Sequence, residues 1–168
     1  HDPRQLKRDA VAATKAQAAA LVAQAQAAAA AQAQAAANAL TVGEVWAVYV
    51  QARRPHWGAL HTKDHERLTR AGGQPAKRGT RGRGVTVAGP LHPLMALALR
   101  DLTAPTIEAW AACEAKTRPT AARLAWRLLK VFLTWCTEQP AYAGLLPATN
   151  PAKTKRAREA LGKAGTKS

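Results

Sequence analysis

Apolar side chains recur at steps of three and four residues in several stretches between residues 41 and 146, and this spacing predicts helices. The first such stretch, residues 42–54, follows Thr41, and Glu44 lies three positions after that threonine. A Thr-x-x-Glu pattern before an apolar run is a capping box, so a helix is expected to begin here and to end before Pro55. Its apolar stripe consists of Val42, Val45, Trp46, Tyr49 and Val50.

Three more helices are expected at residues 57–71, 103–116 and 118–138. The first of them should stop at Gly72-Gly73, and the last is the clearest because its large apolar residues keep helical spacing for its whole length. Alternation of β-branched and polar residues does not extend beyond Val85-Thr86-Val87. The pattern therefore predicts an all-α fold whose core is a small four-helix bundle, with Tyr49 and most of the tryptophans inside it.

Residues 1–40 differ from the rest of the chain because they consist mostly of Ala and Gln, both good helix formers. A long helix preceding the bundle is expected. Its few large apolar residues cannot sustain a heptad seam, which argues against a strong coiled coil. The segment is interpreted as a helical arm or linker, with docking of its alanine face on a partner as the alternative.

Two segments lack the pattern of a packed helix. Residues 72–93 are rich in Gly, Pro and cations, and predict a mobile basic loop. Within it, Arg81-Gly82-Arg83-Gly84 is similar to a minor-groove AT hook, but Gly84 replaces the stiffening proline, so a nonspecific basic loop is preferred. After the bundle (residues 41–146), residues 147–168 form a basic tail that should be poorly ordered on its own.

The charge of the chain is strongly positive. Lys and Arg number 25 against 10 Asp and Glu, giving a formal net charge of +15 among 168 residues. Such a surplus predicts a polyanionic partner, and a nucleic acid is favoured because the cations form stripes on two expected helices as well as runs in the loop and tail. The candidate DNA-binding residues are Lys63, Arg67, Arg70, Lys77, Arg78, Arg81, Arg83, Arg118, Arg123, Arg127 and Lys130.

Other classes of function find little support. His61 and His65 have a spacing that can hold Zn²⁺, but no third ligand follows at metal-site spacing, so neither a metal nor a cofactor is expected. No phosphate-binding Gly-rich loop or paired carboxylates suggest catalysis on a small-molecule substrate. Cys113 and Cys136 are expected to be buried free thiols, as is usual in the cytoplasm. No segment predicts a signal peptide or a membrane span, and the chain has the character of an excised piece.

Several motifs in order resemble one family, the core-binding domain of tyrosine recombinases, the phage-type integrases. The resemblance covers about residues 41–152 and rests on the following segments: Thr41–Trp46, Trp57–His65, Pro93–Thr103 followed by Ile107, Pro119–Arg123, Gly144-Leu145-Leu146 and Asn150-Pro151.

This resemblance implies a SAM-like orthogonal bundle that places two helices across the major groove of DNA at a recombination site. The matching segments here are residues 57–71 and 118–138, which carry the basic stripes. It also implies that the catalytic residues lie in a downstream domain, so that this chain should bind DNA without cleaving it. Other recombinase protomers are implied partners, and the implied location is the nucleoid of a bacterial cytoplasm.

Two further hypotheses stay open at this point. The chain could be an architectural DNA-binding protein whose arm and tail coat DNA without any recombinase. Alternatively, it could be an interaction module in which the Ala-rich helix mediates oligomerisation and the charge is incidental.

Overall fold

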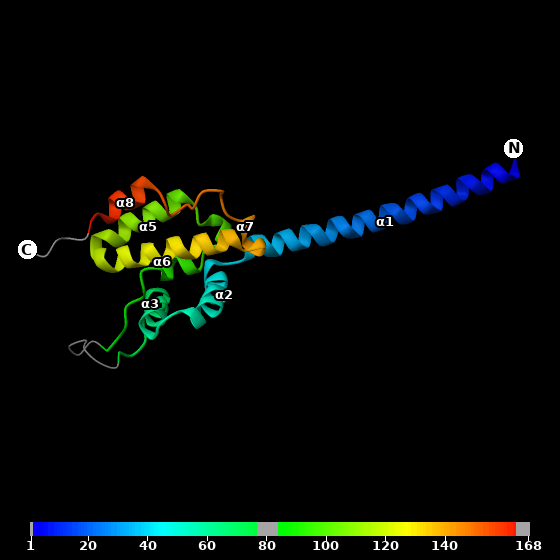
Figure 1. Cartoon of the computed structure of the whole chain (residues 1–168). Coiled ribbons are helices and arrows are strands. Elements are labelled where there is room, and N and C mark those ends of the chain that lie inside the picture. Colours follow the sequence, from blue (N-terminus) through cyan, green and yellow to red (C-terminus); the bar gives the residue numbers. More distant parts are fainter. Residues whose placement is uncertain (1, 77–83, 164–168) are drawn as a thin grey trace, which may run out of the picture. The chain divides into compact units, whose positions relative to one another are not determined.

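The computed structural model describes residues 2–76 and 84–163, and within them all regular structure is helical. The elements are α1 (Pro3–Ala39), α2 (Val42–Arg53), the 3₁₀ helix η1 (Arg54–His56), α3 (Ala59–Thr69), α4 (His92–Met95), the 3₁₀ helix η2 (Leu99–Asp101), α5 (Ala104–Thr117), α6 (Pro119–Glu138), α7 (Pro140–Ala143) and α8 (Lys155–Leu161). Pairing between extended residues in these ranges is limited to the isolated bridges Thr41–Ala98 and Pro75–Val85. The predicted all-α fold is confirmed (Figure 1).

The chain divides into two compact units, residues 1–38 and residues 39–168. The first consists of α1, in which no residue is buried. Asp2 begins this helix by accepting a hydrogen bond from the backbone N–H of Arg4 at 3.0 Å. A helix without any buried residue depends on intrinsic propensity, and its alanine-rich composition supplies that. None of the described helices has the length and apolar composition needed to cross a bilayer.

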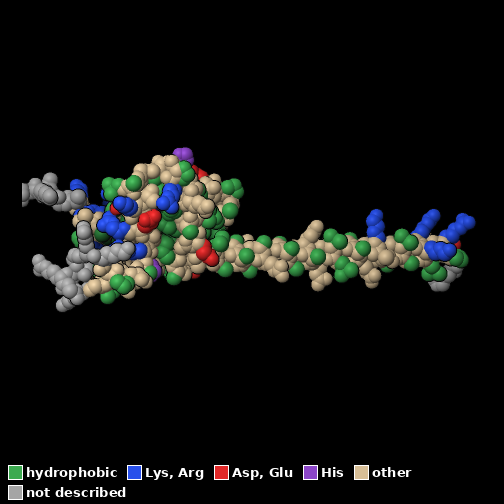
Figure 2. Space-filling view, turned by 90° about the horizontal axis from the view of Figure 1, so that it is seen from below, with side chains coloured by type: hydrophobic (Ala, Val, Ile, Leu, Met, Phe, Trp, Pro, Cys, Tyr) green, Lys and Arg blue, Asp and Glu red, His purple; other side chains and the backbone are tan. Residues whose placement is uncertain are grey.

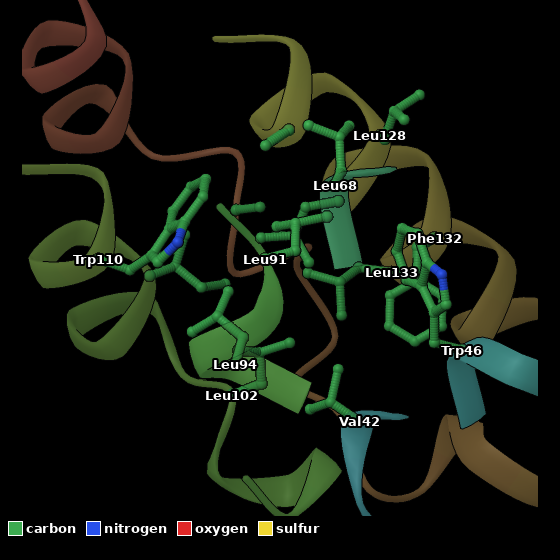
Figure 3. Close-up of a cluster of buried hydrophobic side chains, with 14 of the residues drawn as sticks. Val42, Trp46, Leu68, Leu91, Leu94, Leu102, Trp110, Leu128, Phe132 and Leu133 are labelled. Carbon is green, nitrogen blue, oxygen red and sulfur yellow. The ribbon is translucent and has the colours of Figure 1, made fainter. Parts of the chain in front are cut away.

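The second unit is built around α6, which contacts α2, α3, α5, α7 and α8 (Figure 1). One face of α6 is apolar and its side chains are buried: Ala122, Ala125, Leu128, Leu129, Phe132, Leu133 and Cys136. Figure 3 shows that Trp46 of α2 and Leu68 of α3 point toward this face, while Leu91, Leu94 and Trp110 come from the other side of the core. The predicted apolar face of residues 118–138 therefore forms the centre of the core.

The start of α2 follows the sequence prediction closely. The Thr41 hydroxyl accepts from the Glu44 N–H at 3.2 Å, and the Glu44 carboxylate accepts from the Thr41 N–H at 2.8 Å. This reciprocal pair is the capping box. The α helix ends at Arg53, one residue earlier than predicted, because Pro55 forces the chain into η1. Tyr49 is only 2% exposed, as predicted, and burial raises its pKa to about 12.

The described ends of the predicted basic loop are more ordered than the sequence suggested. Gly73 N–H donates to the Thr86 carbonyl, and Thr86 N–H donates to the Gln74 carbonyl, both at 2.8 Å. Gly89 then passes so close to α3 that a Cβ there would collide with the Leu68 carbonyl. Leu91, immediately beyond, is completely buried. The expectation that most of residues 72–93 cannot pack is wrong for residues 89–91, which are buried.

Two other expectations need correction. Residues 152–161 of the tail are ordered: α8 contacts α5 and α6, and Ala152, Ala157 and Leu161 are buried. Ala157 and Leu161 lie four residues apart on α8, enough for one buried stripe on this short helix, and Ala152 is buried just before it. Cys136 is buried and free as predicted, but Cys113 is exposed because it faces away from the core on α5.

His65 of α3 is completely buried among aromatic rings. Its ring stacks on Trp57 with centroids 3.9 Å apart, and Trp46 lies 5.5 Å away on another side. Its Nδ1 lies 2.8 Å from the His61 carbonyl, which requires a proton on Nδ1, and its buried Nε2 has no hydrogen-bond partner. Burial is the main cause that lowers the pKa of His65. Within the described ranges, no three His, Cys, Asp or Glu side chains are grouped as metal ligands would be.

Replacing the central aromatic of α6 should destabilise the bundle strongly. Phe132 is fully buried, 4.9 Å from the Trp46 ring, whereas the adjacent Val131 is 57% exposed. Phe132→Ala should lower the free energy of unfolding by about 3–5 kcal/mol through lost burial and a cavity. Val131→Ala, the matched control, should change it by less than about 0.5 kcal/mol. Urea unfolding followed by tryptophan fluorescence measures both, because every tryptophan lies in the bundle unit.

Stability should also fall with acidification because His65 is buried in its neutral form. Its folded pKa lies below the unfolded value of 6.5, so its contribution is complete above pH 6.5 and is lost as pH falls towards the folded pKa. The loss should not exceed about 1.4 kcal/mol per pH unit. Urea unfolding against pH should show this slope in the native chain and in the exposed-site control His56→Gln, but a smaller slope in His65→Gln. An NMR titration of the folded native chain gives an independent check, and a pKa at or above 6.5 there would contradict the prediction.

Candidate nucleic-acid interface

The cations of α3 are on its solvent-exposed side, opposite the buried residues Thr62, His65 and Leu68. Lys63 and Arg67 lie one helical turn apart and are both exposed. Arg67 donates to Asp64 at 3.1 Å but keeps 54% of its side chain exposed. Arg70 follows the last helical residue and has extended backbone angles, so only the first two of the three predicted cations share a helix face.

The cations of α6 lie beside its buried face at different depths. Arg127 is exposed, whereas Arg123 and Lys130 are half-buried. Arg123 donates to the Leu161 carbonyl at 3.1 Å and thereby satisfies the C-terminus of α8. The ammonium group of Lys130 lies 3.5 Å from the centroid of the Trp126 ring, a cation–π contact. The predicted stripe of Arg123, Arg127 and Lys130 therefore exists. Of these three cations, Arg127 alone has a side chain that makes no hydrogen bond, ion pair or cation–π contact with the described residues.

The segment that follows the bundle adds cations to the same place. Asn150 donates to the Lys130 carbonyl at 2.9 Å and to the Thr134 hydroxyl at 3.1 Å, which fixes residues 150–153 on α6. Trp126 strengthens this attachment because its indole N–H donates to the Ala152 carbonyl at 2.8 Å. Lys153 and Arg158 consequently lie close to Lys130. Burial is the main cause that lowers the pKa of Lys130, and the positive charges of Lys153 and Arg158 lower it further.

These positions form two adjoining hollows in the surface. An open groove of about 570 Å³ is lined by α2 and α6 residues together with Lys153, and it includes the cations Arg53, Arg127 and Lys130 and one carboxylate, Glu138. A smaller cleft of about 180 Å³ is lined by Trp126, Lys130, Lys153, Thr154 and Arg158. Figure 2 shows Lys and Arg side chains gathered on one face of the bundle unit, and a separate group at the N-terminal end of α1. Both hollows could accommodate negatively charged groups.

Carboxylates neutralise few of these cations. Ion pairs within 4.0 Å in the part of the chain that the structure describes are Arg67–Asp64, Arg118–Glu114 and Lys155–Glu159. Lys63, Arg127, Lys130, Lys153 and Arg158 have no such partner in the same ranges. A group of cations without acidic partners produces a positive potential that attracts phosphate groups.

Arg118 has a different environment from the other candidates. Its guanidinium donates to the Glu114 carboxylate at 2.5 Å and 3.2 Å, and to the Ala88 carbonyl at 2.6 Å. The Glu114 side chain is only 10% exposed, so Arg118 compensates a nearly buried charge and fastens the end of the basic loop to α5. The predicted loop cations Lys77, Arg78, Arg81 and Arg83 lie outside the described residues.

Three cations of the two hollows were not among the individual candidates from the sequence: Arg53, Lys153 and Arg158. The tail run that contains Lys153 and Arg158 is visibly basic, so charge alone signalled its importance. Its position next to Lys130 depends on Asn150 and Trp126, whose hydrogen bonds span 20 and 26 residues of sequence. No local pattern encodes such contacts.

Comparison with known proteins identifies the family of the chain. Residues 41–159 match the phage integrase core-binding domain, which covers more than half of the chain, so this chain belongs to that family. It is also similar to prophage integrase IntF of Escherichia coli (strain K12), with 36% identity over 117 residues, covering 64% of this chain and 24% of that protein. The chain thus spans about a quarter of the length of this relative. No solved structure matched the chain.

Loss of Arg118 should destabilise the fold, because Glu114 would remain nearly buried without its partner. Arg118→Gln should lower the free energy of unfolding by about 3 kcal/mol, within the range found when one member of a buried ion pair is removed. The double variant Glu114→Gln/Arg118→Gln should be more stable than the sum of the two single effects predicts. Urea unfolding of the four chains measures this coupling. Lys116→Gln, an exposed cation on the same helix, is the control and should have little effect.

Proposed function

We propose that the bundle unit binds double-stranded DNA as the core-binding domain of a site-specific tyrosine recombinase. The observation that carries this proposal is the set of cations on α3, α6 and residues 153–158 that lack carboxylate partners within the described ranges. Membership of the integrase core-binding family supports DNA as the polyanion. The helices that carry these cations include the two that the family resemblance places across the major groove.

Most of the contacts are expected to involve phosphates. Lys63 and Arg67 on α3, and Arg127 and Lys130 on α6, are on flexible stems that suit phosphate oxygens. Such contacts fix the position of a protein on the duplex but do not read its sequence. Weak sequence preference is therefore expected for this chain on its own, with base contacts limited to the exposed side of α3.

The chemistry of recombination belongs to other parts of the whole protein in this proposal. The described residues present cations and an apolar core; the buried titratable groups Tyr49, His65 and Cys136 lie within that core, and the buried Glu114 is paired with Arg118. The chain is expected to hold duplex DNA at the recombination site while protomers assemble on it, and to cleave nothing itself. Location at the bacterial nucleoid follows if DNA is the partner.

DNA binding by the native chain should depend steeply on salt. If about six phosphates are neutralised, log K should fall against log salt with a slope near −5, at about −0.9 per phosphate. The double variant Lys63→Gln/Arg67→Gln should reduce the magnitude of this slope by about two. Fluorescence anisotropy with a labelled duplex over a range of salt concentrations measures the slopes.

The control for this experiment is Arg100→Gln, which removes one exposed cation of η2 outside both hollows. Its slope should equal that of the native chain. Binding insensitive to salt, or an absence of duplex binding at low salt, would overturn the proposed function. An oligomer that forms through α1 and ignores duplex DNA would instead favour the interaction-module hypothesis.

A further inference from the structure

The small cleft between α6 and the start of α8 has an unusual composition. Three of its five lining residues are cations: Lys130 comes from α6, and Lys153 and Arg158 come from the run of residues 153–158. Within the described ranges, no carboxylate lies within 4.0 Å of any of the three. Each therefore faces like charges at short range without internal compensation, a destabilising arrangement unless an anion is supplied from outside.

The cations are brought together by a rigid scaffold. Asn150 and Trp126 attach residues 150–153 to α6. The Thr154 hydroxyl accepts from the Ala157 N–H at 3.2 Å and fixes the first turn of α8, and Arg123 holds the last carbonyl of that helix. Because these contacts fix the backbone around the cleft before any ligand arrives, little ordering of the chain is needed on binding.

The size and chemistry of the cleft suit one phosphate group. Its volume of about 180 Å³ is enough for one phosphate with bridging waters. Trp126 closes one side with an apolar ring, against which Lys130 is held by its cation–π contact. A phosphodiester carries one negative charge and two free oxygens, so it can accept hydrogen bonds from α6 and from residues 153–158 at once.

We propose that this cleft seats one backbone phosphate of DNA, and that its occupation stabilises the docked position of α8. The inference rests on the proposed function, since it names a specific contact within that DNA interface. The coupling has a simple electrostatic origin. Without an anion, Lys130 on α6 repels Lys153, which precedes α8, and Arg158, which lies within α8, whereas a phosphate between them attracts both sides. A ligand that binds only the docked arrangement shifts the equilibrium towards it.

Hydrogen exchange of α8 amides, followed by mass spectrometry with and without a short DNA duplex, tests this coupling. In the native chain, the duplex should slow exchange at the C-terminal amides of α8. The cleft variant Lys153→Gln/Arg158→Gln should lose this DNA-dependent slowing, and its salt slope should be smaller in magnitude by about one. Without DNA, its α8 should exchange no faster than in the native chain, because the substitutions remove repulsion rather than a docking contact.

The matched control is Lys155→Gln/Arg156→Gln, which removes two neighbouring cations that do not line the cleft. This variant should keep the DNA-dependent slowing. Equal slowing in the cleft variant and the native chain would overturn the inference, as would tight duplex binding without any change in α8. Those results would leave the proposed function intact, whereas failure of the native chain to bind the duplex would overturn both.

Inorganic phosphate distinguishes the two sources of the ligand. We compare the duplex with inorganic phosphate at the same total concentration of phosphate groups. The duplex should slow hydrogen exchange in α8 and inorganic phosphate should not, because neighbouring contacts on DNA hold its backbone phosphate in place. Slowing by inorganic phosphate alone, with none from the duplex, would assign the cleft to a free anion and overturn the DNA contact.

Discussion

The bundle depends on α6, because this helix must bury one apolar face while its cations stay in contact with solvent. Seven side chains of this helix are buried, and α2, α3, α5, α7 and α8 all pack around it. A charged group loses much hydration free energy when it enters such a core. The side chains of Arg123 and Lys130 are therefore only half-buried, beside the core rather than in it. The apolar face thereby determines both where the core lies and where the cations emerge.

Residues at the edge of α6 connect these two roles. Trp126 is partly buried, donates to the Ala152 carbonyl, and supports the Lys130 ammonium on its ring. Asn150, in the segment that follows the bundle, donates a hydrogen bond from its side-chain amide to the Lys130 carbonyl of the same helix. These contacts stabilise the fold. They also bring Lys153 beside Lys130 without a further loss of conformational entropy. The positively charged cleft is therefore a consequence of how residues 150–161 close the core.

Elements with strong local signals could be predicted from sequence, and elements fixed by distant contacts could not. The capping box at Thr41 and the long periodicity of α6 need no partner to be recognised, and both are confirmed. Helix α8 has seven residues and only two buried side chains, Ala157 and Leu161, so its order depends on α5 and α6. The two thiols differ for a similar reason, since helical spacing alone did not show that Cys113 faces solvent.

The same distinction governs the cations, because a positive side chain contributes to a DNA surface only when the fold does not already use it. Arg118 immediately precedes α6 and Arg127 lies within it, yet the first is paired with Glu114 and the second is exposed without a carboxylate partner in the described ranges. Arg123 is intermediate, with one hydrogen bond to the end of α8. The net charge of +15 therefore overstates the charge available to a partner. In the proposed DNA interface, the position of each cation relative to nearby carboxylates and carbonyls would determine the strength of binding, and residues 153–158 would increase it by adding cations beside Lys130.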